Sequence, residues 1–281
     1  MKTFAKVIML AGAISSTLIL AAYIRFQRKV RTDVARLFAE MQIKNTGPIG
    51  EAILAGLPEV AQRYIRYTGI IGKPFIHAVR LKQTGKFRTG NDQPWMDITA
   101  DEYYTVNPPG LIWNATFRIA GLPLIKGYDL YRHARGNMLG LIAAIFPIFN
   151  VKGEKLTQGT MLRYLNEMTW FPSSFLSDYI TWTERDENSV DVTFHDGGKN
   201  VTGTLFIDQD GRLVNFVAQR YMEANGQYFL NTWETPFDEY GEMAGLRLPV
   251  AGRAIWKLPE GDLTYAQLRL TEVEYNRPEV Y

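Results

Sequence analysis

The sequence contains no cysteine and only three histidines among its 281 residues. Without cysteine the chain has no disulfide, no thiolate nucleophile, and no zinc or iron–sulfur site with sulfur ligands. The histidines, His77, His133 and His195, form no His-Glu-x-x-His pattern, so the sequence predicts no metal site. The nucleophile motifs Gly-x-Ser-x-Gly and Ser-x-x-Lys and the glycine-rich phosphate loops are also missing, and we expect no cofactor.

Acidic side chains are absent from residues 1–31, which carry six basic ones. The rest of the chain then holds 25 of the 31 Lys and Arg residues against 29 Asp and Glu, so the body is mildly acidic. A nucleic-acid-binding surface would place the basic excess on the folded body. We therefore expect no nucleic-acid partner.

Residues 7–24 form a run of 18 residues without a charge. At ~1.5 Å per residue, such a helix is ~27 Å long, enough to cross the core of a bilayer. The run is too long for a signal peptide, and no small-residue cleavage site follows it. We predict a single-span membrane anchor over residues 1–31. Its basic flanks are Lys2, Lys6, Arg25, Arg28, Lys29 and Arg31.

The remaining sequence predicts an α+β fold that is mostly β. Residues 32–56 are expected to be a helical linker, with an amphipathic helix at 32–41, and residues 57–281 a single domain. A helix is expected at 57–69, with Pro58 in its first turn and Gly69 at its end. Alternating apolar and polar residues predict half-buried strands. These strands are expected at 77–88, 95–106, 111–119, 124–132, 180–184, 189–195, 201–207, 213–220, 228–233, 246–250, 253–257 and 264–275.

The middle of the domain lacks this alternation. Residues 137–149 are an apolar stretch, too short to span a bilayer, and we interpret them as a buried helix or an apolar lid. Residues 157–168 carry Met161, Leu165 and Met168 at helical spacing, and Pro172 disfavours helical geometry at Phe171. The pattern therefore predicts a helical insertion near residues 137–177.

Several segments resemble an uncharacterised bacterial family that is known only as a domain of unknown function. They are residues 57–74 (LPEVAQRYIRYTGIIGKP), 80–88 (RLKQTGKFR), 164–176 (YLNEMTWFPSSFL), 196–198 (DGG), 206–221 (FIDQDGRLVNFVAQRY) and 270–276 (LTEVEYN). The architecture also resembles periplasmic lipoprotein carriers, in which a curled sheet and a helical lid enclose a cavity for acyl chains. This resemblance implies a half-barrel with helices on its concave face, although a shared fold does not establish a shared function.

The sequence gives two predictions for the side of the membrane on which the folded body lies. The basic cluster after the predicted span favours a cytoplasmic body, because cytoplasmic flanks carry the excess of Lys and Arg. The carrier-like fold implies an extracytoplasmic body. Both alternatives stay open.

Glu167 is the acid of most interest, because it follows Arg163 and Tyr164 and precedes Trp170. A carboxyl group among aromatic rings has a raised pKa and can act as an acid or base. The alternatives are an exposed i, i+4 pair with Arg163 or a buried carboxylate that fixes the helix to the sheet. His133 is a second, weaker candidate for an acid or base.

The sequence is rich in aromatic residues, with 6 Trp, 15 Tyr and 15 Phe. Such residues either fill a core or line a cavity that has a few polar groups. The cavity hypothesis assigns ligand contacts to Trp113, Tyr131, Arg132, Leu141, Phe146, Tyr164, Glu167, Trp170 and Arg220.

Three functions follow from these observations. The first is a membrane-anchored, non-enzymatic protein that binds a lipid, an acyl chain or another amphiphile in a half-barrel. The second is a hydrolase that acts on an amphiphile, with Glu167 or His133 as its acid or base. The third is an anchored interaction module with a filled core. The oligomeric state is left open.

Overall fold

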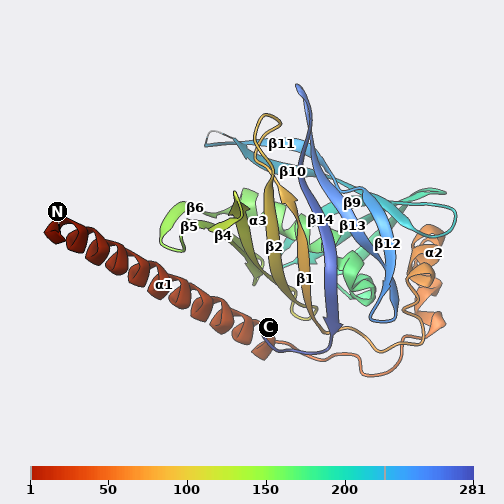
Figure 1. The fold of residues 1–281 in the computed structure, drawn as a ribbon. Helices are drawn as coiled ribbons and strands as arrows, with labels where there is room; N and C mark the ends of the chain where they lie inside the picture. The colour runs from red at the N-terminus through yellow and green to blue at the C-terminus, as the bar shows by residue number, and fades with distance from the viewer. Residues whose placement is uncertain (1, 225) are drawn as a thin grey trace.

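The computed structural model describes the backbone of residues 2–224 and 226–281 and the side chains of residues 17–224 and 226–281. One antiparallel sheet of 14 strands dominates this part of the chain (Figure 1). Its strands are β1 (Ala78–Phe87), β2 (Met96–Thr105), β3 (Gly110–Ile119), β4 (Leu122–Arg132), β5 (Arg135–Ile142), β6 (Phe146–Lys152), β7 (Ile180–Asp186), β8 (Ser189–Asp196), β9 (Lys199–Ile207), β10 (Leu213–Ala224), β11 (Gln227–Glu234), β12 (Phe237–Met243), β13 (Leu246–Leu258) and β14 (Gly261–Tyr275). The helices are α1 (Lys2–Ala39), α2 (Glu59–Thr68) and α3 (Glu154–Glu167), with 3₁₀ turns η1 (Glu51–Gly56), η2 (Met168–Trp170) and η3 (Pro172–Leu176).

The sheet consists of two meanders that meet at the first and last strands. The strand order is β6-β5-β4-β3-β2-β1-β14-β13-β11-β10-β9-β8-β7, and β12 pairs with β13. Helix α3 follows β6 in the chain and contacts β4, β5 and β6 on one arm and β9 and β10 on the other. The sheet therefore curls around α3, which confirms the predicted mostly-β half-barrel with helical elements on its concave face.

The joint between the two meanders depends on a glycine. Gly85 of β1 lies opposite Leu268 of β14. A Cβ atom at Gly85 would lie 2.0 Å from the carbonyl oxygen of Gln267, so only glycine allows the strands to approach this closely.

Strands β2 to β4 are covered on both faces. Neighbouring side chains of a strand point to opposite faces. Tyr103 packs edge-on against Phe38 of α1, whereas Tyr104 packs against Phe171 on the concave side, with ring centroids 4.9 Å apart. In β4, the Tyr128 hydroxyl donates to Asp33 of α1. Helix α1 thus covers the outer face of strands whose inner face meets α3.

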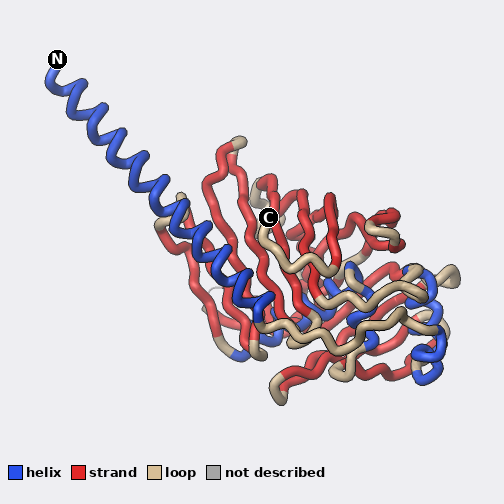
Figure 2. The backbone as a smooth tube through the Cα atoms, turned by 90° about the horizontal axis from the view of Figure 1, so that it is seen from below, coloured by secondary structure: helices blue, strands red, loops and turns tan. Residues whose placement is uncertain are grey.

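Helix α1 runs unbroken from the predicted anchor through the helix expected at 32–41 (Figure 2). Its second half buries Phe26, Val30, Val34, Leu37 and Phe38 against the outer face of the sheet. Within the side chains that the structure describes, no helix is long and apolar enough to cross a membrane. The anchor predicted at 7–24 is therefore not confirmed, and residues 7–16 of it lie outside the described side chains. The boundary predicted at residue 31 stays a prediction, although α1 passes through it.

The helix predicted at residues 137–149 is wrong, because these residues form the β5–β6 hairpin, and the alternative of an apolar lid stays a prediction. The alternation is hidden because β5 is partly covered on both faces, whereas β6 is exposed except at Val151. Met138 and Gly140 border the concave side, whereas Leu139 and Leu141 also pack toward α1. The turn contains Ala143 and Ala144 with φ angles of 49° and 57°, a conformation that alanine rarely adopts. The predicted helical insertion is therefore reduced to α3, η2 and η3.

Two other local predictions agree with the structure, and two strands differ from the prediction. Helix α2 ends at Gly69, which has a φ angle of 75° and caps the helix in the left-handed conformation. Phe171 is non-helical before Pro172, with φ −139° and ψ 67°. The segments predicted at 246–250 and 253–257 are one continuous strand, β13, and β12 was not predicted.

Candidate functional site

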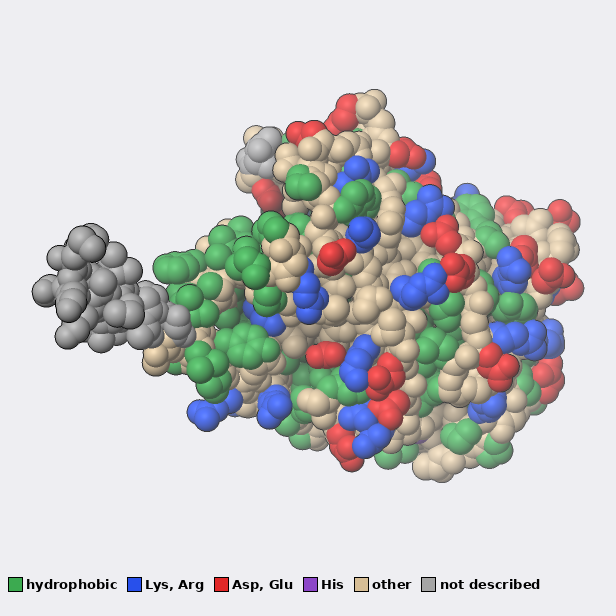
Figure 3. All heavy atoms as spheres, viewed as in Figure 1, with side chains coloured by type: hydrophobic (Ala, Val, Ile, Leu, Met, Phe, Trp, Pro, Cys, Tyr) green, Lys and Arg blue, Asp and Glu red, His purple; other side chains and the backbone are tan. Residues whose placement is uncertain are grey.

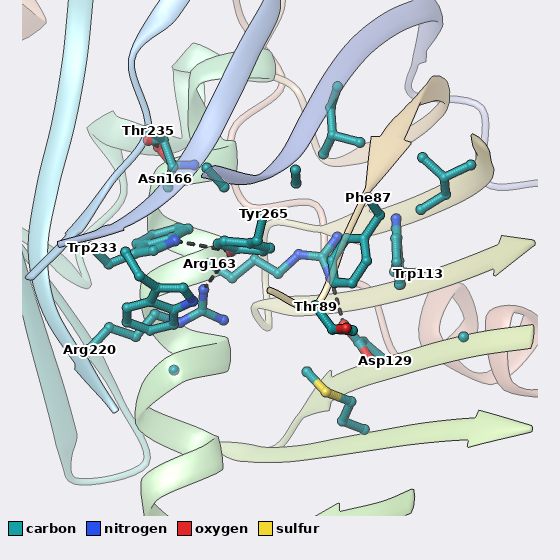
Figure 4. A pocket seen from close by; sticks show the side chains of 18 of the residues that line it. Phe87, Thr89, Trp113, Asp129, Arg163, Asn166, Arg220, Trp233, Thr235 and Tyr265 are labelled. Atoms are coloured by element: carbon teal, nitrogen blue, oxygen red, sulfur yellow. Dashed lines mark hydrogen bonds and ion pairs between the residues drawn. The ribbon is translucent and has the colours of Figure 1, made fainter. Parts of the chain in front are cut away.

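A cavity of about 710 Å³ lies between α3 and the curled sheet (Figure 4). Most of its wall is apolar, and it receives side chains from both arms of the sheet. The polar groups are few and come largely from α3, β4 and β10. Side chains that border the cavity include Phe87, Ile98, Trp113, Phe117, Ile125, Asp129, Arg163, Asn166, Glu167, Trp170, Arg220, Trp233, Trp256 and Leu268.

Arg163 of α3 forms ion pairs with three buried carboxylates. Its Nε lies 2.7 Å from Glu167 Oε1, and its Nη1 lies 2.6 Å from Asp129 Oδ2 on β4. Its Nη2 pairs with Glu102 on β2. The guanidinium also stacks on Trp113, 4.7 Å from the ring centre. We call Arg163, Glu102, Asp129 and Glu167 the arginine cluster, and it ties α3 to two strands.

Burial perturbs the acids of the arginine cluster. Burial, with the neighbouring charge of Glu167, raises the pKa of Glu102 well above its usual range. Burial also raises the pKa of Asp129 to about 6 and that of Glu167 in the same direction, although Arg163 opposes both shifts. Burial acts to lower the pKa of Arg163, but the three acids outweigh it and raise that pKa. The cluster therefore keeps its cation, and its acids take up protons at a higher pH than exposed acids do.

Tyr104 indicates where a proton is held. Its hydroxyl lies 2.9 Å from Glu102 Oε2 and 2.9 Å from Glu167 Oε2. A phenol has one proton, so both contacts are hydrogen bonds only if one carboxyl group is protonated and donates to Tyr104. Burial raises the pKa values of both Glu102 and Glu167, which favours one proton shared between this pair of carboxyl groups.

Arg220 of β10 borders another side of the cavity. Its guanidinium stacks on Trp233, 4.4 Å from the ring centre, and lies 5.6 Å from that of Trp256. Trp233 Nε1 donates to the Tyr265 hydroxyl at 3.0 Å, and Arg220 Nη1 reaches the same hydroxyl at 3.4 Å. The Nε of Arg220 is buried without a hydrogen-bond partner.

The structure brings only some of the predicted ligand-binding residues to the cavity. Tyr131 and Tyr164 are core side chains, and Tyr164 donates to the carbonyl of Thr105. Arg132 pairs with Glu40 at the end of α1, and Leu141 packs near α1. Phe146 is exposed at the β5–β6 turn. The predicted residues that border the cavity are Trp113, Glu167, Trp170 and Arg220.

The two candidate acid–base residues are not brought together at the cavity. Glu167 is buried, and Arg163 and Tyr104 bind its two oxygens. The predicted i, i+4 pair with Arg163 is present but buried rather than exposed. His133 lies in the β4–β5 turn, where it is exposed and pairs with Glu40. Among the described side chains, no group of three or more His, Cys, Asp or Glu is arranged to hold a metal ion.

The sequence reasoning missed Glu102 and Asp129 as partners of Glu167. Glu102 shares its face of β2 with Ile98, Ala100 and Tyr104, so an acid stands among inward-facing apolar residues. The position of Glu102 on the apolar face of this strand therefore indicates a buried carboxylate. The partner itself was not readable, because Glu102 and Arg163 are 61 positions apart in the chain.

A family model described as "Family of unknown function (DUF6544)" matches residues 47–268. The chain belongs to the DUF6544 family. This confirms the resemblance to a family of unknown function. No curated protein matches the chain.

Solved structures with a similar fold share little sequence with this DUF6544 protein. A DUF1329 family protein from Desulfovibrio piger has 10% identity and a TM-score of 0.44, with 83% of this chain and 95% of that chain covered. A putative outer membrane lipoprotein-sorting protein domain from Vibrio parahaemolyticus has 8% identity and a TM-score of 0.47, with 78% and 92% covered. A LolA superfamily protein from Nitrosomonas europaea has 6% identity and a TM-score of 0.43, with 77% and 92% covered.

Proposed function

We propose that this protein binds the apolar chain of an amphiphile in the cavity between α3 and the sheet. The observation that carries the proposal is the cavity itself, with its volume of about 710 Å³ and its mostly apolar wall. Ligand sites have volumes of ~300–1,000 Å³ and combine apolar walls with a few placed polar groups. Each buried methylene group contributes ~0.8 kcal/mol to binding, so an acyl chain is a suitable ligand.

The cavity proposal is tested with the full-length protein, because α1 packs on the sheet and its removal would expose apolar surface. The probe is N-phenylnaphthylamine, a neutral dye whose fluorescence rises in apolar surroundings. Ala266→Phe places a ring at a position that borders the cavity. The matched control, Ala55→Phe, adds the same ring at an exposed position of η1. We expect saturable binding in the wild type and in Ala55→Phe, and an affinity at least about tenfold weaker in Ala266→Phe.

Native mass spectrometry and solvent extraction of the purified protein identify a natural ligand. A stoichiometric lipid in the extract supports the proposal. Equal dye binding by Ala266→Phe and the wild type, or no uptake of dye or lipid by the wild type, would contradict it. In that case an interaction module becomes the better interpretation.

We further propose that the ligand enters and leaves at a membrane surface. Exposed apolar side chains gather at the β3–β4 and β5–β6 turns, close to α1 (Figure 3). We call this set the apolar rim. Phe149 and Ile148 belong to the rim and also border the cavity, so the rim and the cavity are continuous. The rim consists of Ile119, Leu122, Leu124, Ile142, Phe146, Ile148 and Phe149.

The charges around the apolar rim favour an anionic membrane. Asp129 is the only acid between residues 119 and 149, and it is buried. Exposed Arg135 lies in this range, and residues 25–31 of α1 carry four basic side chains and no acid. Apolar side chains beside basic ones bind anionic bilayers by combined burial and charge attraction.

Vesicle sedimentation tests this membrane contact. The double variant Leu122→Glu with Phe146→Glu places two acids on the rim, and Phe206→Glu on β9 is the control at an exposed apolar residue elsewhere. We expect the wild type and Phe206→Glu to sediment with phosphatidylglycerol vesicles and the double variant to stay in solution. Equal sedimentation of all three proteins would contradict the proposed contact.

The hydrolase hypothesis stays an alternative with a specific test. Glu167 borders the cavity, but both of its oxygens already accept hydrogen bonds. If Glu167 is the acid or base, Glu167→Gln abolishes hydrolysis of an acyl ester while the protein still binds the dye.

A further inference from the structure

Four arginines border the cavity, Arg88, Arg163, Arg220 and Arg253, and they differ in their partners. Arg163 pairs through three nitrogens with three carboxylates. Arg220 forms no ion pair with any carboxylate in the described part of the chain, and its Nε has no hydrogen-bond partner. Two acids of the site, Asp129 and Glu167, feel the charge of Arg220 but are bound to Arg163. In the cavity wall, Arg163 and Arg253 are paired with carboxylates, and the donors of Arg88 bind Thr264 and Asn91. Arg220 differs from them because it keeps a buried donor without an acceptor.

Neighbouring groups exclude water from one face of the Arg220 guanidinium. The ring of Trp233 covers the guanidinium at 4.4 Å, and Gly159 of α3 lies beside it, so a Cβ atom there would be 3.2 Å from Nε. A cation withdrawn from water is costly unless an anion or hydrogen-bond acceptors compensate for the loss. Stacking on an aromatic ring recovers part of this cost and holds the planar group in one orientation. What is missing is an acceptor for Nε.

We propose that Arg220, held on Trp233 beside Tyr265, binds the anionic headgroup of the amphiphile, and that the headgroup is a carboxylate. This assignment rests on the proposed function and names its ligand class. A planar guanidinium matches a carboxylate with two parallel hydrogen bonds. The negative charges of Asp129 and Glu167 in the same cavity disfavour a second negative charge on the ligand, so a monoanion fits better than a phosphate dianion.

The geometry also places the chain of the ligand. Figure 4 shows Arg220 and Trp233 on one side of the cavity and Phe87 and Trp113 on the other. A headgroup at Arg220 leaves the apolar wall beyond the arginine cluster for the acyl chain. Phe117 and Ile125 continue that wall toward the apolar rim.

Three probes with the same chain test the assignment: dodecanoic acid, dodecanol and dodecyl phosphate. Each displaces the neutral dye from the full-length protein at about pH 8, where the acid is ionised. We expect the wild type to bind dodecanoic acid at least about tenfold more tightly than dodecanol, since a charge-assisted hydrogen bond contributes this much or more. Dodecyl phosphate is expected to bind more weakly than the acid.

The variant Arg220→Gln separates the headgroup from the chain. It is expected to bind dodecanol as the wild type does, which also shows that it is folded, and to lose the preference for the acid. Arg220→Lys is expected to restore part of the preference, because a lysine keeps the charge but not the planar pair of donors. The matched control is Arg88→Gln. Arg88 borders the same cavity, but its donors already bind the carbonyl of Thr264 and the side chain of Asn91.

The outcomes distinguish the two proposals. Equal binding of the acid and the alcohol by the wild type, or an unchanged preference in Arg220→Gln, overturns the headgroup assignment and leaves the cavity proposal standing. Tighter binding of dodecyl phosphate than of the acid overturns the choice of a carboxylate. If no probe displaces the dye from the wild type, the proposed function fails and the headgroup assignment fails with it.

Discussion

Replacing Arg163 with methionine tests whether the arginine cluster is buried as the structure indicates. Methionine keeps an unbranched side chain of similar length and removes the charge, leaving Glu102, Asp129 and Glu167 without their shared cation. The side chains of these acids are 0%, 7% and 6% exposed, so water cannot replace the guanidinium. Removing one partner from a buried ion pair lowers the free energy of unfolding by about 3–5 kcal/mol. We expect a loss of this size at about pH 7.

The loss in Arg163→Met has a defined pH dependence. Without the cation, the pKa values of the acids rise further in the folded state, so the folded variant binds more protons than the folded wild type. A group whose pKa is raised on folding contributes stability at low pH and loses it as pH rises through the folded pKa. Each extra proton changes the free energy of unfolding by about 1.4 kcal/mol per pH unit. Most of the difference between variant and wild type should therefore disappear by about pH 5.

Urea unfolding of the full-length protein, followed by tryptophan fluorescence at about pH 5, 6 and 7, measures this effect. Adding Glu102→Gln and Glu167→Gln to Arg163→Met removes two of the three carboxyl groups that lost their cation and should recover part of the stability at pH 7. The control Arg66→Met breaks an exposed pair with Glu51, which contributes below about 1 kcal/mol. A loss under 1 kcal/mol in Arg163→Met, or one that is the same at all three pH values, would refute the buried cluster.

Three further predictions test other parts of the structure. The pKa of Asp129, raised from 3.8 to about 6, implies that this group contributes stability below about pH 4 that is lost as pH rises to about 6. In Asp129→Asn that fall, about 3 kcal/mol in total, should be missing from the pH profile of urea unfolding, and an unchanged profile would contradict the shift. Leu37→Ala, at a buried position of α1, should lower the free energy of unfolding by about 2–5 kcal/mol, and a change below 1 kcal/mol would mean that α1 does not pack on the sheet. Gly85→Ala should lower the free energy of unfolding by about 3 kcal/mol, because the added Cβ would meet Gln267. The control Gly47→Ala, with no atom within 4 Å of the added Cβ, should change it by less than about 0.5 kcal/mol. Similar values for the two variants would disprove the close approach of β1 and β14.

The alternation of apolar and polar residues predicted the strands that have one buried face and one face exposed to solvent. In β9 the burial pattern alternates strictly from Val201 to Ile207, and this strand was predicted within two residues. The same rule failed for β5, where the cavity and α1 approach opposite faces, and for β6, whose apolar side chains are mostly exposed. The length of α1 was misjudged for a related reason. Its apolar first half and amphipathic second half suggested two elements, although the backbone is continuous.

The candidate site was only partly readable from the sequence. The i, i+4 spacing of Arg163 and Glu167 and the surrounding aromatic residues identified Glu167, whereas the aromatic composition left a filled core and a cavity as alternatives. The partners of Glu167 come from other strands, and the bond between Tyr104 and Glu167 joins residues 63 positions apart. Such pairs depend on strand order and on the crossing of α3 over the sheet, which local patterns do not encode.

The placement of α3 explains how a cavity of this size stays open. An apolar cavity tends to collapse, because its lining atoms lose contacts that closer packing would restore. Polar bonds hold α3 to both arms of the sheet at fixed distances. The arginine cluster ties it to β2 and β4, and Gln158 donates to the carbonyl of Gln219 on β10 at 2.7 Å. Near its end, Asn166 accepts a hydrogen bond from Thr235 at 2.8 Å. Hydrogen bonds are directional and apolar contacts are not, so these polar bonds fix the position of α3 between the two arms of the sheet. The buried charges thereby prevent the collapse of the cavity and leave its volume accessible to a ligand.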